Sequence, residues 1–353
     1  MPSAALDKSN MFDVLYNVPD QIREAVAIGD AATIVSSFAK NDRFAIFGLG
    51  GSAIGGDLLR SYAAATPGTD HVDMSVHRGY TVPGFVNEST NVICSSYSGD
   101  TEETLSAYEI VRKRTSNIMC ITTGGKLGSK ATKAGLPVIT IPKGYQPRCA
   151  LAYSFFPLLT VLGRSGAFTE AAVRANSKAI VELEKNIESL RDLYASTSTK
   201  NPALSLAKKL HGTAPVIYSA SERMDAVNMR WRGQIQENAK QVAFGHVLPE
   251  MNHNEINGWQ HPKGLTKQFS VVLLRDVDDH KRVQIRFTAL ADIIKKNVKG
   301  IHTVEGMGKS LLSRMFTAIY MGDWVSYHLA TLNNVDPSPV PVIMSLKAFL
   351  AQK

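Results

Sequence analysis

Short apolar runs alternate with helical stretches through the first half of the chain. Strand-like runs cover 43–47, 73–77, 91–96, 117–122 and 137–141, and helical patterns cover 53–65 and 101–113. A glycine-rich loop, 124–128, and a short helix separate the last two strands. Strands that alternate with helices at this spacing favour a parallel sheet that helices cover on both faces.

The same alternation restarts in the second half. A long helical stretch at 167–194 ends at a Ser/Thr-rich break, 196–202, which we interpret as the connection between two domains. Beyond it we expect strands at 215–220, 269–275 and 300–304, helices at 224–242, 280–296 and 309–332, and a final helix ending near Leu350. The pattern predicts an α/β protein with an N-terminal domain at 1–165, a helical connection at 166–202 and a C-terminal domain at 203–353.

Composition narrows the class of protein. The 353 residues are 44% hydrophobic and 20% charged, as in soluble globular proteins. The chain has no apolar run near the roughly 20 residues that span a bilayer, and residues 1–8 lack the layout of a signal peptide. Cys94, Cys120 and Cys149 are scattered and odd in number, which fits free thiols in a reducing cytosol. We therefore expect a cytoplasmic protein without a membrane partner.

Charge and ligand spacing exclude further classes. The formal net charge is +8, but the basic residues are dispersed and no nucleic-acid recognition motif stands out. A positive cleft that attracts a small anionic substrate would account for the excess of basic residues. Basic side chains that are simply solvated on the surface account for it better. His253 has no His or Cys three or four residues away, so no metal-ligand spacing is present. We expect no nucleic-acid partner and no metal.

The strand-to-helix turn at 95–104 carries an unusual density of hydroxyls. Ser96, Ser98 and Thr101 surround Gly99 just before a helix. Free N–H groups at a helix N-terminus favour an anion, and neighbouring hydroxyls can donate to phosphate oxygens. The alternative is a capping turn with Asp100 as N-cap and Glu103 completing a capping box. A cap needs one such group rather than four, so we favour a bound phosphoryl group.

A second glycine-rich turn, Gly48 to Ser52, also follows a strand. With Ala53 it fits the GxGxxA form of a dinucleotide fingerprint, and Asp70 or Asp73 lies near the spacing of the expected acidic residue. A single match of this kind is weak. The rival interpretation is that Ser52 joins this loop to the serine-rich loop in one shared anion site.

Candidate proton-transfer groups lie in the second half. Glu237 stands late in a predicted helix, and His253 follows in a loop dense in polar residues. A carboxylate and an imidazole in one cleft support general acid–base catalysis, although alone they would be a surface helical residue and a loop-stabilising hydrogen bonder. Arg148, at a helix start, could bind an oxyanion or form a surface ion pair. Lys347 alone would be a solvated helix-face lysine.

Taken together, these segments resemble the bifunctional phosphoglucose/phosphomannose isomerase family, which is built from two sugar isomerase (SIS) domains. The likeness extends over most of the chain, through 48–52, 96–101, 147–153, 237–240, 252–255 and Lys347. It implies two tandem SIS domains, each a flavodoxin-like parallel sheet flanked by helices. It also implies an aldose–ketose isomerase that converts glucose 6-phosphate, and mannose 6-phosphate, to fructose 6-phosphate.

The resemblance also implies a role for each candidate residue. Four hydroxyls would clamp the phosphate, from Ser52, Ser96, Ser98 and Thr101, with Gly51 beside the substrate. Glu237 would move a proton between C1 and C2 through a cis-enediol, and Arg148 would stabilise the enediolate. His253 and Lys347 would assist at the sugar ring. The family works without a cofactor as a homodimer in which the histidine loop reaches the neighbouring subunit's site.

Two other functions remain open from the sequence. A non-catalytic SIS regulator would bind sugar phosphates without turnover, but such proteins usually carry a further binding segment, and we see none before residue 42. The isomerising half of a glucosamine-phosphate synthase is disfavoured, because the chain has neither an amidotransferase domain nor an N-terminal nucleophilic cysteine.

Overall fold

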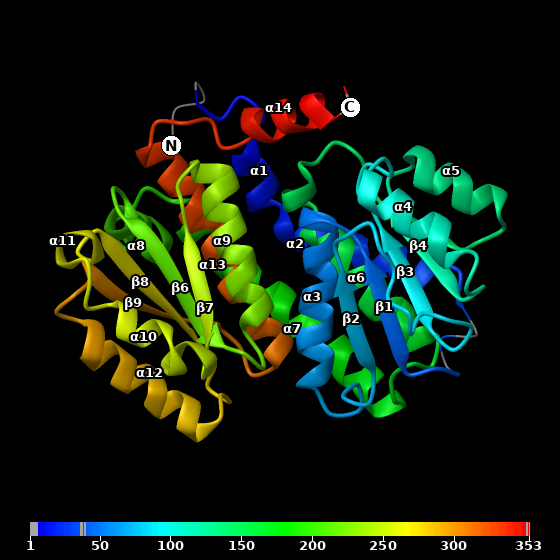
Figure 1. Cartoon of the computed structure of the whole chain (residues 1–353), viewed down its shortest axis with the longest axis horizontal. Helices are drawn as coiled ribbons and strands as arrows, with labels where there is room; N and C mark the ends of the chain where they lie inside the picture. The colour runs from blue at the N-terminus through cyan, green and yellow to red at the C-terminus, as the bar shows by residue number, and fades with distance from the viewer. Residues whose placement is uncertain (1–5, 36–37, 39, 351, 353) are drawn as a thin grey trace.

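Two parallel β-sheets, one from each half of the chain, form the frame of the molecule (Figure 1). The computed structural model describes residues 6–35, 38, 40–350 and 352, so residues 1–5 of the segment in which we expected no signal peptide, 1–8, lie outside it. In the described part, the first sheet has the order β2-β1-β3-β4-β5 and the second the order β7-β6-β8-β9. The strands are β1 Arg43–Phe47, β2 Asp73–His77, β3 Asn91–Ser95, β4 Ile118–Thr122, β5 Val138–Thr140, β6 Ala214–Ala220, β7 Phe244–Leu248, β8 Phe269–Arg275 and β9 Gly300–Glu305. The predicted α/β class with parallel sheets flanked by helices is confirmed.

Helices cover the sheets and fill the space between them. The first half contains α1 Met11–Tyr16, α2 Val18–Ala31, α3 Gly50–Ala64, α4 Glu102–Val111, α5 Gly125–Lys133 and α6 Leu151–Arg164. The rest are α7 Glu170–Ala195, α8 Pro202–Leu210, α9 Asp225–Ala239, α10 Glu255–Gly258, α11 Lys263–Thr266, α12 Lys281–Ile294, α13 Leu311–Leu332 and α14 Pro341–Leu350, with 3-10 turns η2 Pro147–Cys149 and η3 Glu250–His253. None of these helices combines the length and apolar character needed to cross a membrane.

One continuous core joins the two halves. Helix α3 packs on α6 and α9, and α13 packs on α7, α8 and α9. Phe155 of α6 meets Phe316 of α13 edge to face, with ring centroids 4.7 Å apart. The two halves therefore share buried aromatic surface, and the domain boundaries at 165 and 203 stay a prediction.

Helices α3 and α9 lie antiparallel at this junction. The start of α3 is beside the end of α9 in one cleft, while Arg60, late in α3, pairs with Asp225 at the start of α9 at 2.5 Å. Each of these helices begins at the carboxyl end of its own sheet. Consequently, the carboxyl ends of the two sheets face opposite ends of the molecule (Figure 1).

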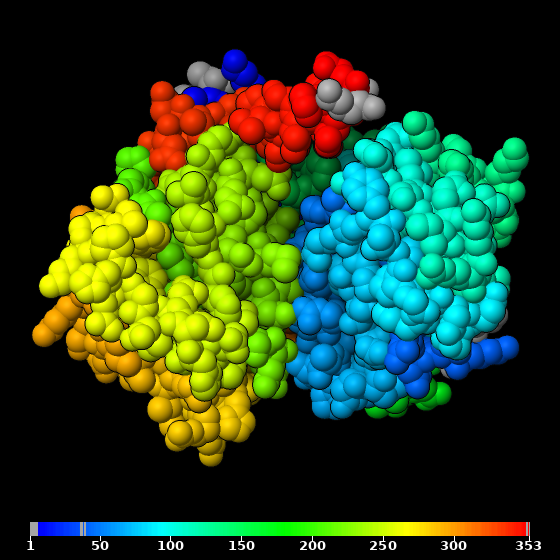
Figure 2. All heavy atoms as spheres, in the orientation of Figure 1, coloured from blue at the N-terminus to red at the C-terminus, as the bar shows by residue number. Residues whose placement is uncertain are grey.

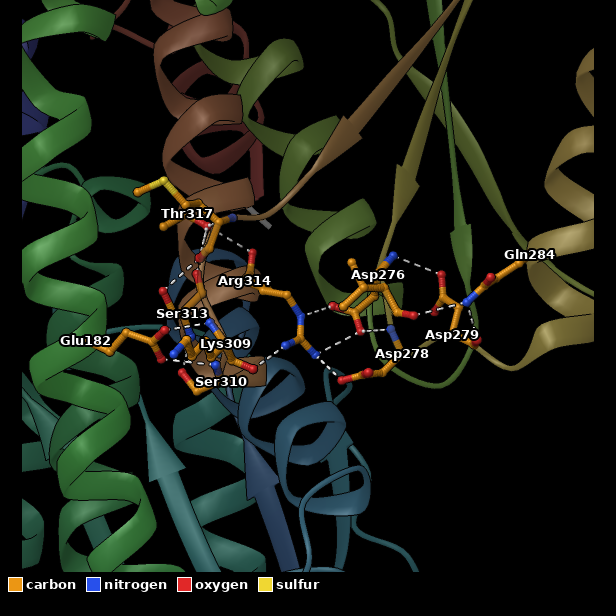
Figure 3. Close-up of polar contacts among 12 residues, drawn as sticks. Glu182, Asp276, Asp278, Asp279, Gln284, Lys309, Ser310, Ser313, Arg314 and Thr317 are labelled. Carbon is orange, nitrogen blue, oxygen red and sulfur yellow. Dashed lines mark hydrogen bonds and ion pairs between the residues drawn. The ribbon is translucent and has the colours of Figure 1, made fainter.

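A buried ion pair fastens the start of α13 to the second sheet (Figure 3). The Arg314 guanidinium donates to both oxygens of Asp276, from Nε at 2.6 Å and from Nη2 at 3.1 Å. On the other side, the Glu182 carboxylate of α7 accepts from the Ser310 N–H at 3.0 Å, where a negative charge complements the helix N-terminus. Helices α7 and α13 and the loop after β8 are thus held as one unit.

Several predicted boundaries are wrong for local reasons. Helix α3 already begins at Gly50, and the expected loop at 124–128 is mostly helix α5, in which the Gly128 N–H bonds the Gly124 carbonyl at 3.1 Å. Helix α9 ends at Ala239 because Lys240 adopts a left-handed φ of 53°. The edge strand β7 that follows had not been predicted.

Candidate active site

The two Gly/Ser loops meet at the carboxyl ends of adjacent strands. Strand β1 pairs directly with β3, so the turns that leave Phe47 and Ser95 lie side by side. The Ser52 hydroxyl accepts from the Tyr97 N–H at 2.8 Å, and Ser95 Oγ donates to the Ser52 carbonyl at 2.9 Å. This junction is also the point where the strand order reverses, which is where open α/β sheets bind ligands.

The hydroxyls of the serine-rich loop are linked to one another. Ser96 Oγ and Thr101 Oγ1 are 2.9 Å apart, and the Gly99 N–H donates to Ser96 Oγ at 3.1 Å. Ser98 is exposed on the outside of the turn, where its hydroxyl accepts from the Asp100 N–H at 3.2 Å. The four predicted clamp residues thus lie in one contact region, although their binding of phosphate stays a prediction.

The capping alternative for this loop is wrong. Thr101, not Asp100, occupies the N-cap position of α4, and no side-chain hydrogen bond caps the helix. The Asp100 carboxylate instead accepts from the Lys126 N–H at 3.1 Å, at the start of α5. The hydroxyls are therefore not consumed in holding the helix N-terminus.

Gly99 allows a very close approach between two loops. It has φ +76°, and a Cβ placed on it would lie 1.9 Å from the Gly124 carbonyl oxygen. The Leu127 N–H donates to the Gly99 carbonyl at 2.9 Å. The start of α5 therefore supports the serine-rich loop from behind.

The dinucleotide alternative fails on the position of its acidic residue. Asp73 opens β2 and pairs with Arg43 at 3.1 Å, which places it at the amino end of the sheet. Asp70 accepts from the Gly68 N–H within its own turn. Neither carboxylate lies at the carboxyl ends of the strands, where a ribose would bind.

Gly51 brings the first loop against the segment that carries Arg148. A Cβ on Gly51 would lie 2.4 Å from the Pro147 carbonyl oxygen and 2.9 Å from the Arg148 nitrogen. Any side chain here would force η2 away from the start of α3. The predicted substrate contact of Gly51 is untested, but its role in close packing is clear.

Arg148 and Glu237 meet across the junction of the two halves. Arg148 Nη1 lies 3.3 Å from Glu237 Oε2, and the side chains are 3% and 33% exposed. The alternative of a surface ion pair at Arg148 is therefore wrong. Around them lies a cleft of about 140 Å³, which is visible as the seam between α9 and α3 in Figure 2.

Other groups that the sequence reasoning missed line the same cleft. Arg78 pairs with Asp57 of α3, and burial raises the pKa of the Asp57 carboxyl although Arg78 opposes the shift. Arg230 donates to both oxygens of Asp323 at 3.1 and 3.2 Å. These arginines stand outside any recognisable local motif, so no sequence signal could have found them.

Lys240 closes the end of α9 next to the cleft. Its ammonium donates to the Glu237 carbonyl at 2.8 Å and to the Pro337 carbonyl at 3.0 Å. Burial, with the nearby positive charge of Arg148, lowers the pKa of Lys240 to about 8. Lys240 therefore loses its positive charge as the pH rises through about 8, and it does so next to Glu237.

Neither His253 nor Lys347 lines this cleft in the single chain. His253 is exposed on η3, directly after β7, at the carboxyl edge of the second sheet. Its segment is anchored where the Tyr218 hydroxyl bonds the Glu255 carboxylate and accepts from Trp259 Nε1 at 3.0 Å. Lys347 is exposed on α14, whose first residues line a pocket together with Glu237 and Lys240. One chain therefore brings together the hydroxyls, Arg148 and Glu237 and places the start of α14 beside Glu237, whereas His253 lines neither pocket.

Helix α14 lies on the surface with apolar side chains exposed. Every residue of the helix is exposed, and Val342 and Met344 are 82% and 59% exposed. In Figure 2 it forms a separate ridge across the top of the molecule. Among the described residues, no group of three or more His, Cys, Asp or Glu side chains is arranged to hold a metal ion.

Comparisons with known proteins agree with this geometry. Residues 199–350 match the family model described as the bacterial phospho-glucose isomerase C-terminal SIS domain. The bifunctional phosphoglucose/phosphomannose isomerase of Caldicellulosiruptor bescii is 43% identical over 344 residues, 97% of this chain and 99% of that protein. Its counterpart from Aquifex aeolicus is 36% identical over 308 residues, 85% of this chain and 88% of that protein.

A solved structure shares the fold at low identity. The C-terminal domain of glucosamine-fructose-6-phosphate aminotransferase from Francisella tularensis superposes with a TM-score of 0.70 at 14% identity. The match covers 94% of this chain and 98% of that one. It supports the arrangement of two SIS-type sheets in tandem.

Proposed function

This chain belongs to the bifunctional phosphoglucose/phosphomannose isomerase family, and we propose that it interconverts glucose 6-phosphate and mannose 6-phosphate with fructose 6-phosphate. The observation that supports this most strongly is the contact of Arg148 with Glu237 at 3.3 Å, next to the hydroxyl-bearing loops. Removing a proton beside a carbonyl needs a base and a cation that stabilises the oxygen.

The phosphate end of the sugar binds at the serine-rich loop. Ser96, Ser98 and Thr101 donate hydroxyl hydrogens to the phosphate oxygens, and Ser52 contributes from the start of α3. The Ser52 oxygen already accepts from Tyr97, so its own hydrogen remains to be donated. Gly51 lets the sugar run from this loop toward Arg148.

The proton transfer occurs at Glu237. The carboxylate takes the proton from C2 of the open-chain aldose while O1 gains a proton, which gives a cis-enediol. The carboxyl then returns a proton to C1 while O2 loses its proton and becomes the carbonyl. C1 is reduced and C2 oxidised within one molecule, so no external oxidant enters. Arg148 stabilises the negative charge that develops on the oxygens.

The same intermediate explains two substrates. Glucose and mannose phosphates differ only at C2, and removal of the C2 proton converts both to one enediol. A site that places Glu237 near C2 from either face therefore accepts both epimers.

We further propose that the working unit is a homodimer with shared sites. His253 and Lys347 assist opening of the sugar ring, and in one chain His253 lies on η3 after β7 of the second sheet, whereas the serine-rich loop follows β3 of the first sheet. The exposed apolar face of α14 supports burial against a second copy. In the dimer, the histidine of one subunit completes the site of the other.

The cellular setting follows from the chemistry and the cysteines. All three cysteines are free and buried, which supports a reducing cytoplasm. There the reaction links glucose and fructose phosphates in glycolysis and gluconeogenesis.

A coupled assay tests the proposal directly. Glucose 6-phosphate and mannose 6-phosphate are each supplied to the purified protein, with and without EDTA, and fructose 6-phosphate is measured. We expect turnover of both epimers that EDTA leaves unchanged. Binding of fructose 6-phosphate without any turnover would favour a regulator instead, and loss of activity on chelation would contradict the cofactor-free reaction.

A further inference from the structure

We propose that Asn238 is a positioning residue that holds the Arg148 guanidinium beside Glu237 without neutralising its charge. The inference rests on the proposed function, because it assigns the held charge to stabilising the enediolate. It concerns a residue inside α9, adjacent to Glu237 in the sequence and wholly buried.

A chain of hydrogen bonds fixes the orientation of the Asn238 amide. Arg148 Nε donates to Asn238 Oδ1 at 2.6 Å, and Asn238 Nδ2 donates to Ser326 Oγ at 2.9 Å. The Ser326 hydroxyl donates its single hydrogen to the Asp323 carbonyl at 2.7 Å, so it can only accept a hydrogen bond from Asn238. The amide oxygen must therefore face Arg148.

The other side of the guanidinium is held in the same way. Arg148 Nη2 donates to the carbonyl oxygens of Pro337 and Ser338 at 2.8 and 2.7 Å. Nε and Nη2 thus have all their hydrogens committed, and Nη1 alone turns toward Glu237. The direction of Nη1 is set by groups that do not react.

The chemistry of the acceptors distinguishes Arg148 from its neighbour. Arg230 lines the same cleft, but a buried carboxylate, Asp323, binds it through both oxygens. Arg148 is fixed by an amide and two carbonyls, which are neutral. A neutral acceptor orients a cation and leaves its charge available to a developing anion, whereas a carboxylate cancels most of it.

The variant Asn238→Asp adds charge while keeping an acceptor for Arg148 Nε. Its second oxygen replaces the Nδ2 donor, so the Ser326 hydroxyl must turn its hydrogen from the Asp323 carbonyl to the new carboxylate. We expect kcat for fructose 6-phosphate to fall at least about tenfold, KM to stay within about twofold and the thermal midpoint to stay near that of the parent. A purely structural acceptor would be replaced without loss, so a parental kcat in this variant overturns the inference.

A double-mutant cycle shows whether Asn238 acts through Arg148. The probe is 5-phosphoarabinonate, whose carboxylate resembles the enediolate, and its Kd is measured by calorimetry. Asn238→Asp should weaken binding about tenfold in the parent and add nothing in an Arg148→Met background. Equal weakening in both backgrounds overturns the positioning role.

Matched variants complete the experiment. Asn333→Ala removes another amide that bonds the end of α9, at the Ala239 carbonyl, without touching Arg148, and should leave kcat unchanged. Should Asn238→Asp fail to fold, Ser326→Ala removes the acceptor of Asn238 Nδ2, which loosens the amide and should lower kcat in the same direction; a parental kcat there overturns the inference as well. An Arg148→Met variant with full activity would instead refute the proposed chemistry itself.

Discussion

Arg148 and Arg230 illustrate how the same side chain can serve different ends in one cleft. The carboxylate of Asp323 pairs with Arg230, while Glu237 meets Arg148 through a single contact at 3.3 Å. A buried carboxylate partner gives a locked structural pair, and a single contact to a half-exposed carboxylate can open when substrate arrives. The residue-level chemistry thus depends on the partners as much as on the arginines.

Gly99 offers a test of the serine-rich loop at the scale of one methyl group. In Gly99→Ala, the new Cβ would meet the Gly124 carbonyl and occupy a backbone with φ +76°. Strain of about 1–3 kcal/mol should displace the loop and raise KM for fructose 6-phosphate about tenfold. Steady-state kinetics measures this. Gly84→Ala, with open space around it and no positive φ, should leave KM as it is. An unchanged KM in Gly99→Ala would argue against phosphate binding at this loop.

Asp279 should make stability depend on pH. Burial raises the pKa of Asp279 to about 6, from 3.8, and no described group bonds its Oδ1. Because the folded state holds this proton more tightly, the stabilisation is complete below pH 3.8 and is lost as pH rises through 6. The free energy of unfolding should therefore decrease as the pH rises from about 4 to 6. Asp279→Asn should make this decrease smaller by about 1–2 kcal/mol, after allowance for solvent screening.

Urea unfolding at a series of pH values measures the effect of Asp279. The matched control is Asp292→Asn, an exposed carboxylate that pairs with Lys295 on the surface and should leave the slope between pH 4 and 6 nearly unchanged. Identical slopes in Asp279→Asn and the parent would show that this carboxyl does not titrate there.

Among the elements, the attachment of α13 to the loop after β8 depends on Arg314. Its partner Asp276 has a side chain that is 0% exposed, so Arg314→Met would leave a buried charge without a partner. We expect the free energy of unfolding in urea to fall by about 3–5 kcal/mol. Arg23→Met, which breaks exposed pairs with Asp20 and Glu188, should cost less than about 1 kcal/mol. Similar losses of unfolding free energy in the two variants would contradict the conclusion that the buried Arg314–Asp276 pair stabilises the protein more than the exposed pairs do.

A helix or strand could be predicted where the residues that define it are neighbours in the sequence. Strands β3 and β4 are continuous buried apolar runs and were predicted within a residue. Strand β7 was missed because Gly245 and His246 interrupt it and the strand is only partly buried at the sheet edge. The hydroxyls of the serine-rich loop are neighbours in sequence, so their chemistry was visible. The hydrogen bond from Arg148 to Asn238 joins residues 90 positions apart, so no local sequence pattern could have predicted it.

For the whole molecule, the shared-site homodimer makes a quantitative prediction. Subunits carrying Glu237→Gln are mixed, after partial unfolding and refolding, with subunits carrying His253→Ala. If the histidine of one subunit serves the glutamate of the other, each mixed dimer has one intact site. Random pairing should then restore about a quarter of the parental activity. Each variant refolded alone is the control, and a mixture as inactive as the two separate variants would contradict sites shared between subunits.

The most direct test of the account is conversion of fructose 6-phosphate in D2O, followed by NMR of the aldose product. If Glu237 carries the proton through a cis-enediol, the parent protein should place deuterium at C2 of the product. Glu237→Gln should slow the formation of labelled product by about 10²–10⁴-fold while retaining affinity for the sugar phosphate. Parental rates of turnover, or of deuterium incorporation, in Glu237→Gln would contradict the assignment of Glu237 as the group that moves the proton.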